Sequence, residues 1–199
     1  NPVRVIFGPG ESKKIAEHVK TLGKKAMIVS YAEHDFFKQL LCDTEDALQQ
    51  AGIEVVRFYH VQANPLMSHI RQATEICKKE SVEFCIAIGG GSVMDSTKVI
   101  AAGGFYDDDP WKMFVSRHDC VVDVPPQKSL PTVMVPTLPA TSSEMNCTSV
   151  ATNDETKEKA YVSTAALYPC LAIIDPALTC TLPKYQTAVG AVDAMSHVL

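Results

Sequence analysis

Short apolar runs alternate along the chain with amphipathic stretches of helical length. The apolar runs are rich in β-branched residues, which favours buried strands, while the amphipathic stretches repeat apolar residues every three or four positions, which favours helices. Strands are predicted at 3–7, 25–30, 53–59, 84–88, 130–136 and 171–174. Helices are predicted at 12–22, 36–51, 66–79, 93–102 and from 183 to 199. This alternation is typical of an α/β fold with a parallel sheet.

Local signals place the ends of some elements. Ser12 is the expected N-cap of the first helix, and Gly52 is the residue expected to end the second. A turn-rich NDETK segment separates two runs, 147–152 and 158–163, and therefore predicts a β-hairpin.

The final predicted helix, 183–199, has apolar residues that need a packing partner. These residues are Val189, Ala191, Val192, Met195 and Val198. A single helix cannot supply that partner itself. We therefore expect residues 1–182 to form one domain, residues 183–199 to begin a second, helical one, and more protein to follow Leu199.

Composition excludes several function classes. The chain has 199 residues, 46% of them hydrophobic and 21% charged, which is typical of a globular protein. A net charge of -5 and the absence of a basic stripe give no reason to expect a nucleic-acid partner. No apolar run reaches the roughly 18 residues of a membrane span, and residues 1–20 lack a signal-peptide pattern, so we expect no membrane partner and a cytoplasmic location.

The seven cysteines are an odd number without a CxxC pair. This pattern fits neither a disulfide framework nor a zinc ribbon. We expect them to be reduced and mostly buried.

A glycine-rich turn follows the fourth predicted strand. Gly89, Gly90, Gly91 and Ser92 lie between an apolar run and a helix, where backbone N–H groups and the positive end of the helix dipole favour an anion such as a pyrophosphate. Such turns are also glycine-rich for steric reasons alone, and the spacing is not GxGxxG. Asp95 and Lys98 in the first turns of the helix could touch a ligand.

Two further groups of residues are candidates for chemistry. Asp193 and His197 lie four apart on one helix face, and a carboxylate with an imidazole suits Zn²⁺ or Fe²⁺. A bare pair of this kind is more often a surface hydrogen bond, although apolar flanks favour a buried position. The polar segment from Thr137 to Asn146 offers hydroxyls to a cofactor groove, or is a solvated turn.

Together these blocks resemble the iron-containing, or group III, alcohol dehydrogenases. The resemblance runs along the whole chain, from the opening NPVRVIFGPG to four ordered blocks: GGGSVMDSTK (89–98), PTLPATSSEMN (136–146), AIIDPALTCTLP (172–183) and GAVDAMSHVL (190–199). Within the family, DPWKMF (109–114) and TLPATSSE (137–144) are most similar to the butanol dehydrogenase and aldehyde reductase branch.

The resemblance implies a Rossmann-like dinucleotide-binding domain at 1–182 and an all-helical metal-binding domain of which 183–199 is the first helix. It implies that NAD or NADP lies against the 89–92 turn, with Asp95 near the nicotinamide. Further cofactor contacts are implied at Asn64, Thr137, Leu138, Thr141, Ser143, Lys159 and Leu178. Asp193 and His197 become the first two ligands of Fe²⁺, alternatively Zn²⁺, and two more histidine ligands are expected in the helical domain.

The implied activity is hydride transfer between NAD(P) and a primary alcohol or aldehyde, with the substrate oxygen on a divalent metal. A homo-oligomer is expected. One alternative is a relative similar to glycerol dehydrogenase or dehydroquinate synthase, which share the glycine turn and the metal helix. Another is a non-catalytic dinucleotide-binding module, because two ligands hold a metal weakly.

Two departures from the family pattern bear on the cofactor. Ser142 replaces a glycine that the family often has, and we expect it to restrict the backbone there. Tyr31 stands where NAD-preferring members have Asp, and no glycine-rich turn follows it. Glu33 or Asp35 would repel a 2′-phosphate, whereas the branch as a whole favours NADP, so the choice between NAD and NADP stays open.

Overall fold

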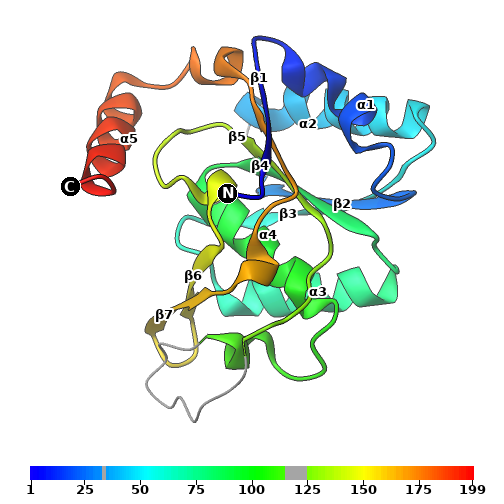
Figure 1. Ribbon diagram of the computed structural model, residues 1–199, viewed down its shortest axis with the longest axis vertical. Helices are drawn as coiled ribbons and strands as arrows, with labels where there is room; N and C mark the ends of the chain where they lie inside the picture. The colour runs from blue at the N-terminus through cyan, green and yellow to red at the C-terminus, as the bar shows by residue number, and fades with distance from the viewer. Residues whose placement is uncertain (33–34, 115–124) are drawn as a thin grey trace.

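A computed structural model describes residues 1–32, 35–114 and 125–199. Six strands form one sheet in the order β1-β8-β5-β4-β2-β3, and every neighbouring pair is parallel (Figure 1). The strands are β1 (Arg4–Phe7), β2 (Lys25–Tyr31), β3 (Glu54–Val61), β4 (Phe84–Gly89), β5 (Thr132–Pro136) and β8 (Leu171–Ile174). The predicted α/β fold with a parallel sheet is confirmed.

Five α-helices belong to the described part of the chain. They are α1 (Ile15–Val19), α2 (Asp35–Gln50), α3 (Met67–Lys79), α4 (Gly91–Gly103) and α5 (Lys184–Ser196). Short 3-10 helices connect other elements: η1 (Glu11–Lys14), η2 (Pro110–Met113), η3 (Ser143–Met145), η4 (Ala165–Leu167) and η5 (Pro176–Thr179).

The sheet separates two apolar cores. Alternate residues of a strand point to opposite faces, and in β2 Ala26 and Ile28 join the core that contains α1 and α2, while Met27 and Val29 join the core that contains α3 and α4. All six residues of β4 are buried, as expected for a central parallel strand covered on both faces. The domain is therefore a three-layer α/β/α sandwich.

The chain reverses its direction across the sheet between β2 and β4. From β2 it crosses to β3 on one side, and from β4 it crosses to β5 on the other. The two strands pair directly, and the Ser30 hydroxyl donates to the Ile88 carbonyl at 2.8 Å. Ligands of open α/β sheets bind at such switch points, outside the carboxyl ends of the strands.

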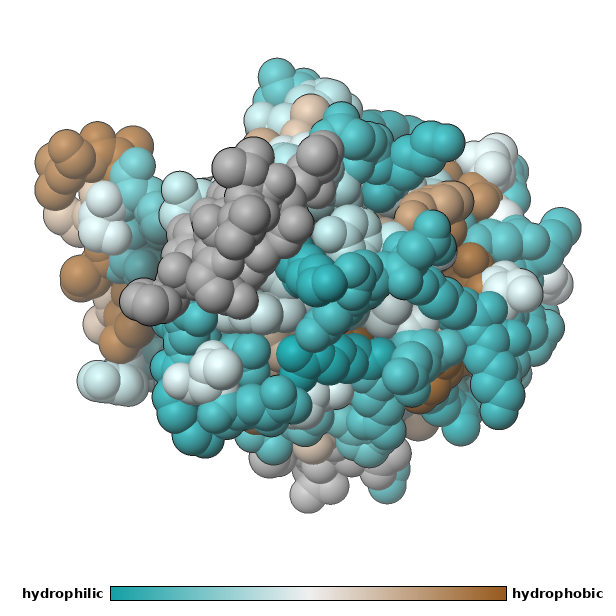
Figure 2. All heavy atoms as spheres, turned by 90° about the horizontal axis from the view of Figure 1, so that it is seen from below, coloured by the Kyte–Doolittle hydropathy of each residue, from teal (hydrophilic) through white to brown (hydrophobic). Residues whose placement is uncertain are grey.

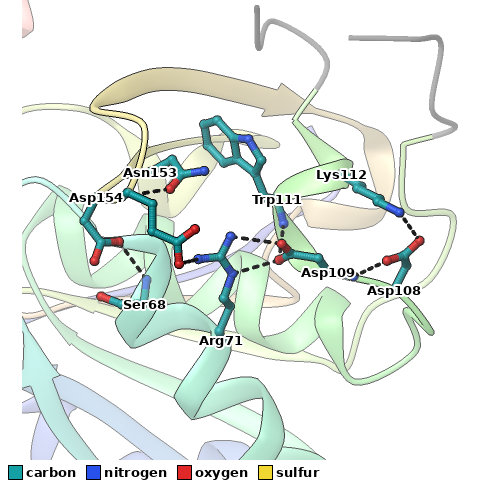
Figure 3. A network of polar contacts seen from close by, with 9 residues as sticks. Ser68, Arg71, Asp108, Asp109, Trp111, Lys112, Asn153 and Asp154 are labelled. Carbon is teal, nitrogen blue, oxygen red and sulfur yellow. Dashed lines mark hydrogen bonds and ion pairs between the residues drawn. The ribbon is translucent and has the colours of Figure 1, made fainter. Parts of the chain in front are cut away.

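The predicted hairpin is also present, as β6 (Thr148–Asn153) and β7 (Glu158–Ser163). Ala151, Ala160 and Val162 of the hairpin belong to the core beside α3 and α4. Arg71 of α3 adds a polar connection, because it contacts Asp109 before η2 and Glu155 in the hairpin turn (Figure 3). The hairpin thereby packs beside α4.

The first helical segment differs from its prediction. It runs over η1 and α1 rather than 12–22, and Gly10, at φ 81°, precedes it in the N-cap position. Ser12 is not the N-cap, because its hydroxyl is buried inside η1 and donates to the Asp175 carboxylate at 2.5 Å. A partner 163 positions away in the chain determines the role of Ser12, which local sequence signals cannot reveal.

Helix α5 projects from the body of the molecule (Figure 1). Its Gly190 is buried, and a Cβ there would lie 2.6 Å from the Pro139 carbonyl oxygen. By contrast, Val192, Met195 and Val198 are exposed, and apolar surface gathers on this projecting part (Figure 2). None of the described helices combines the length and the apolar character needed to span a membrane.

Candidate functional site

A pocket of about 980 Å³ opens beside the carboxyl ends of β2 and β4. Fourteen residues are predicted site residues, and ten of them line this pocket. The ten are Asn64, Gly91, Ser92, Asp95, Leu138, Thr141, Ser143, Lys159, Asp193 and His197. The structure therefore brings the glycine turn, the polar 137–146 segment and the carboxylate–imidazole pair of α5 to one cavity.

The glycine turn is tight because neighbouring side chains leave no room for a Cβ. A Cβ on Gly89 would lie 2.5 Å from Val93 Cγ2, and a Cβ on Gly91 would lie 2.8 Å from both Cγ2 and Oγ1 of Thr141. The steric explanation of the glycines therefore applies at both positions. The anion explanation is compatible with it, since α4 begins at Gly91 and Gly91 and Ser92 line the pocket.

Tyr31, which stands where NAD-preferring members have Asp, lies at the end of β2 and lines the pocket. A Cβ on Gly90 would lie 3.0 Å from the Tyr31 hydroxyl, so the phenol packs directly on the turn. Burial raises the pKa of Tyr31, and a hydrogen bond with the Gly90 backbone opposes that rise. The phenol is thus a neutral wall of the pocket.

Asp95 is held by groups from two other segments. Its Oδ1 accepts from the Ser143 hydroxyl at 2.6 Å, and its Oδ2 accepts from the Val150 N–H at 2.9 Å. Burial raises the pKa of Asp95, while Ser143 and the nearby Lys98 oppose the rise. The carboxylate lines the pocket with its orientation fixed by Ser143 of η3 and Val150 of β6.

Lys98 does not line the pocket, although its position near the start of α4 suggested that it could touch a ligand. Its side chain is fully buried behind the pocket wall and donates to Ser143 Oγ at 2.8 Å, Asn146 Oδ1 at 2.9 Å and the Thr148 carbonyl at 2.9 Å. Burial lowers the pKa of Lys98 to about 8. Helical position alone could not show that the side chain points inward.

The polar 137–146 segment is a structured pocket wall rather than a solvated turn. The Thr137 N–H donates to the Gly89 carbonyl at 3.0 Å, and Thr137 itself is buried and not part of the lining. Ser142 adopts the left-handed conformation with φ 51°. Ser142 therefore has a backbone conformation that glycine adopts more readily than serine, in agreement with the backbone restriction expected where serine replaces a glycine.

The remaining predicted site residues come from three other segments of the chain. The Asn64 N–H donates to Ser92 Oγ at 3.2 Å, which joins the end of β3 to the glycine turn, and Lys159 reaches the pocket from β7. Leu178 lies in η5, packs against the core on the α1 and α2 side, and is not part of the pocket lining. Glu33 and His34 lie outside the described residues, as does the side chain of Asp35.

Sequence reasoning missed several lining residues. Those that follow β3 are Gln62, Ala63 and Pro65, and those in the first strand of the hairpin are Thr148 and Val150. The signal for the first group was available, because residues that follow parallel strands meet at one edge of the sheet. The second group depends on where the hairpin docks, which no local pattern determines.

Asp193 and His197 face each other on α5 with 3.8 Å between Oδ2 and Nε2, and both line the pocket. Their side chains are 40% and 54% exposed, so solvent reaches the pair. Among the described residues no cluster of three or more His, Cys, Asp or Glu side chains could hold a metal ion. The pair fits a divalent cation in donor chemistry but supplies only two ligands.

Comparison with known proteins identifies the family. A profile described as iron-containing alcohol dehydrogenase matches residues 2–176, most of the chain. The chain belongs to the iron-containing alcohol dehydrogenase family. It is 40% identical to a probable NADH-dependent butanol dehydrogenase 1 of Bacillus subtilis (strain 168), over 100% of this chain and 50% of that protein.

Other relatives in the iron-containing alcohol dehydrogenase family differ in their stated cofactor. An NADPH-dependent aldehyde reductase of Escherichia coli (strain K12) is 32% identical over 100% of this chain and 50% of its own length. The crystal structure of an NADH-dependent butanol dehydrogenase A from Thermotoga maritima is similar with a TM-score of 0.89 and 42% identity, over 100% of this chain and 48% of that one. The chain therefore spans about half the length of the relatives it matches.

Proposed function

We propose that this chain binds NAD or NADP in the pocket and serves hydride transfer between that dinucleotide and a primary alcohol or aldehyde. One observation carries the proposal: the glycine turn at the sheet's switch point and the Asp193–His197 pair line the same cavity. A dinucleotide bound at the glycine turn would therefore lie next to a substrate oxygen near the Asp193–His197 pair.

The dinucleotide part of the proposal is supported by the chemistry of the α4 N-terminus. The free N–H groups of a first helical turn and the helix dipole favour an anion, and the glycines let a ligand approach the backbone. Ser92, Thr141 and Ser143 add hydroxyls along the pocket. A volume of about 980 Å³ is ample for a large cofactor.

Asp193 and His197 would hold a divalent metal, Fe²⁺ or alternatively Zn²⁺. When bound, such an ion supplies Lewis-acid polarisation of the substrate oxygen. The hydride chemistry belongs to the nicotinamide. The contribution of this chain is therefore to bind and orient the dinucleotide, with Asp95 and Ser143 fixing the wall beside it.

A second candidate is a non-catalytic dinucleotide-binding module, and the two-ligand count favours it for this chain in isolation. A relationship with glycerol dehydrogenase or dehydroquinate synthase has less support, because the relatives compared above are butanol dehydrogenases and an aldehyde reductase. A homo-oligomer is proposed from the family resemblance alone, and a cytoplasmic location from the absence of a membrane-span or signal-peptide pattern in the sequence.

The test measures NADH oxidation by butyraldehyde in the presence of Fe²⁺, for the wild-type chain and for His197→Ala. We expect NADH binding in both proteins, and any oxidation by the wild-type chain to be slow, chelator-sensitive and abolished by His197→Ala, because two ligands hold a metal weakly. Binding without any aldehyde-dependent oxidation would favour the non-catalytic module. Oxidation that neither a chelator nor His197→Ala reduces would contradict the metal assignment.

A further inference from the structure

Lys98 is a buried cation behind the wall of the pocket. Its side chain is fully buried, and the three oxygens that accept from its ammonium group at 2.8–2.9 Å are all neutral. A buried cation is costly unless its hydrogen bonds are made, and here all three N–H groups have acceptors. Any role for Lys98 must therefore be exerted through those acceptors.

The three acceptors belong to residues that line the pocket. Ser143, Asn146 and Thr148 form most of the wall between η3 and the start of β6, and all three are lining residues. One ammonium group thus connects α4, whose first residues form the glycine turn, to the opposite wall. The two sides of the proposed dinucleotide groove are held together at this point.

The contact with Ser143 also fixes the direction of a hydrogen bond to Asp95. An ammonium group can only donate, so Ser143 Oγ accepts from Lys98, and the single hydroxyl hydrogen of Ser143 is directed to Asp95 Oδ1 at 2.6 Å. Asp95 Oδ2 is engaged by the Val150 N–H. The chain Lys98–Ser143–Asp95 therefore sets the orientation of a carboxylate that faces the pocket.

We propose that Lys98 is a positioning residue for dinucleotide binding, acting through Ser143 and Asn146 without touching the ligand. The proposal rests on the proposed function of the pocket. It differs from a purely structural role, because a structural lysine would alter stability and leave affinity for the dinucleotide unchanged in the folded protein.

The experiment compares NADH affinity by calorimetry in the wild type, Lys98→Met, Ser143→Ala and Lys79→Met. Methionine has a similar length without charge, and Lys79 is an exposed lysine of α3 remote from the pocket wall. We expect Lys98→Met and Ser143→Ala to weaken NADH binding by about ten-fold or more, as expected for hydrogen bonds to a charged group, and Lys79→Met to bind within about two-fold of wild type.

Thermal unfolding recorded with each titration confirms that the variant is folded. Wild-type affinity in folded Lys98→Met would overturn the inference. If Lys98→Met does not fold, Lys98→Gln decides, because its uncharged amide can still donate hydrogen bonds: weakened NADH binding in the folded variant supports the proposal, and unchanged binding overturns it. Failure of the wild type to bind NADH would instead contradict the proposed function itself.

Discussion

Ser142 holds a left-handed backbone conformation that costs a non-glycine residue roughly 1 kcal/mol or more. Ser142→Gly should relieve this cost, partly offset by the greater freedom of glycine in the unfolded chain, and so raise the free energy of unfolding by up to about 1 kcal/mol. Ser68→Gly in α3 is the comparison at a serine with an ordinary helical backbone, and it should lower that free energy, because glycine is unfavourable in a helix and the contact of the Ser68 side chain with Asp154 is lost. Urea denaturation measures both, and destabilisation by Ser142→Gly would contradict the prediction.

Deprotonation of Lys98 should change the free energy of unfolding and the NADH affinity in opposite directions. Its pKa is about 8 in the folded protein and near its usual 10.5 in the unfolded chain, so between these values only the unfolded chain keeps the proton. This group therefore makes stability rise with pH above 8, by at most roughly 3 kcal/mol. NADH affinity should fall over the same range, because the neutral amine has too few donors for its three acceptors.

Denaturation and calorimetry at pH 7.5 and 9.5 would check both trends. These two pH values lie about half a unit below and about one and a half units above the pKa of Lys98. The charged or titratable groups around Lys98 are Asp95, Glu144 and Cys147, with Lys159 acting on Asp95. Lys98→Met is the control, since its affinity should no longer carry the contribution of this ammonium group. An identical pH dependence in wild type and Lys98→Met would contradict the assignment.

At the scale of elements, the junction of β4 and α4 depends on close packing against the 137–146 segment. Gly91→Ala should lower the free energy of unfolding by about 1–3 kcal/mol, because the new Cβ would overlap the Thr141 side chain. Thr141→Ala removes both overlapping atoms, so the double variant should lose less than the sum of the single variants. Additive losses in denaturant titrations would show that the two residues do not meet.

The polar connection between α3, η2 and the hairpin turn is another element-scale feature (Figure 3). Arg71 binds both oxygens of Asp109, whose Oδ1 also accepts the Trp111 N–H at the start of η2. Arg71→Lys loses the bidentate hydrogen bonding to Asp109 and should lower the free energy of unfolding by about 1 kcal/mol. The exposed Lys112–Asp108 pair is the control, and Lys112→Met should change the free energy of unfolding by less than about 0.5 kcal/mol.

How far the sequence predicts these elements depends on how local their causes are. The strands and the hairpin follow from apolar runs and turn residues, and their predicted positions agree with the structure to within about two residues, as expected for boundaries. Ser12 and Lys98 were misjudged because their partners, Asp175 and the 143–148 segment, are distant in the chain. The sequence could predict that the glycine turn, Asp193 and His197 belong to the pocket. The wall formed by the hairpin could not be predicted, because it depends on how the hairpin packs in the folded protein.

At the scale of the whole molecule, one α/β sandwich with a projecting helix unites two functional groups of residues. The sandwich supplies the glycine turn, Asp95 and the hydroxyl-bearing wall, and α5 supplies Asp193 and His197. Gly190 lets α5 approach the Pro139 carbonyl, so this contact helps to hold the two groups around one cavity.

A crystal structure of the chain with NADH tests the central claim most directly. We expect one dinucleotide in the pocket, with its pyrophosphate against the backbone N–H groups of Gly91 and Ser92 and its nicotinamide on the side of Asp193 and His197. A dinucleotide bound elsewhere on the molecule, with the glycine turn left free, would contradict the claim.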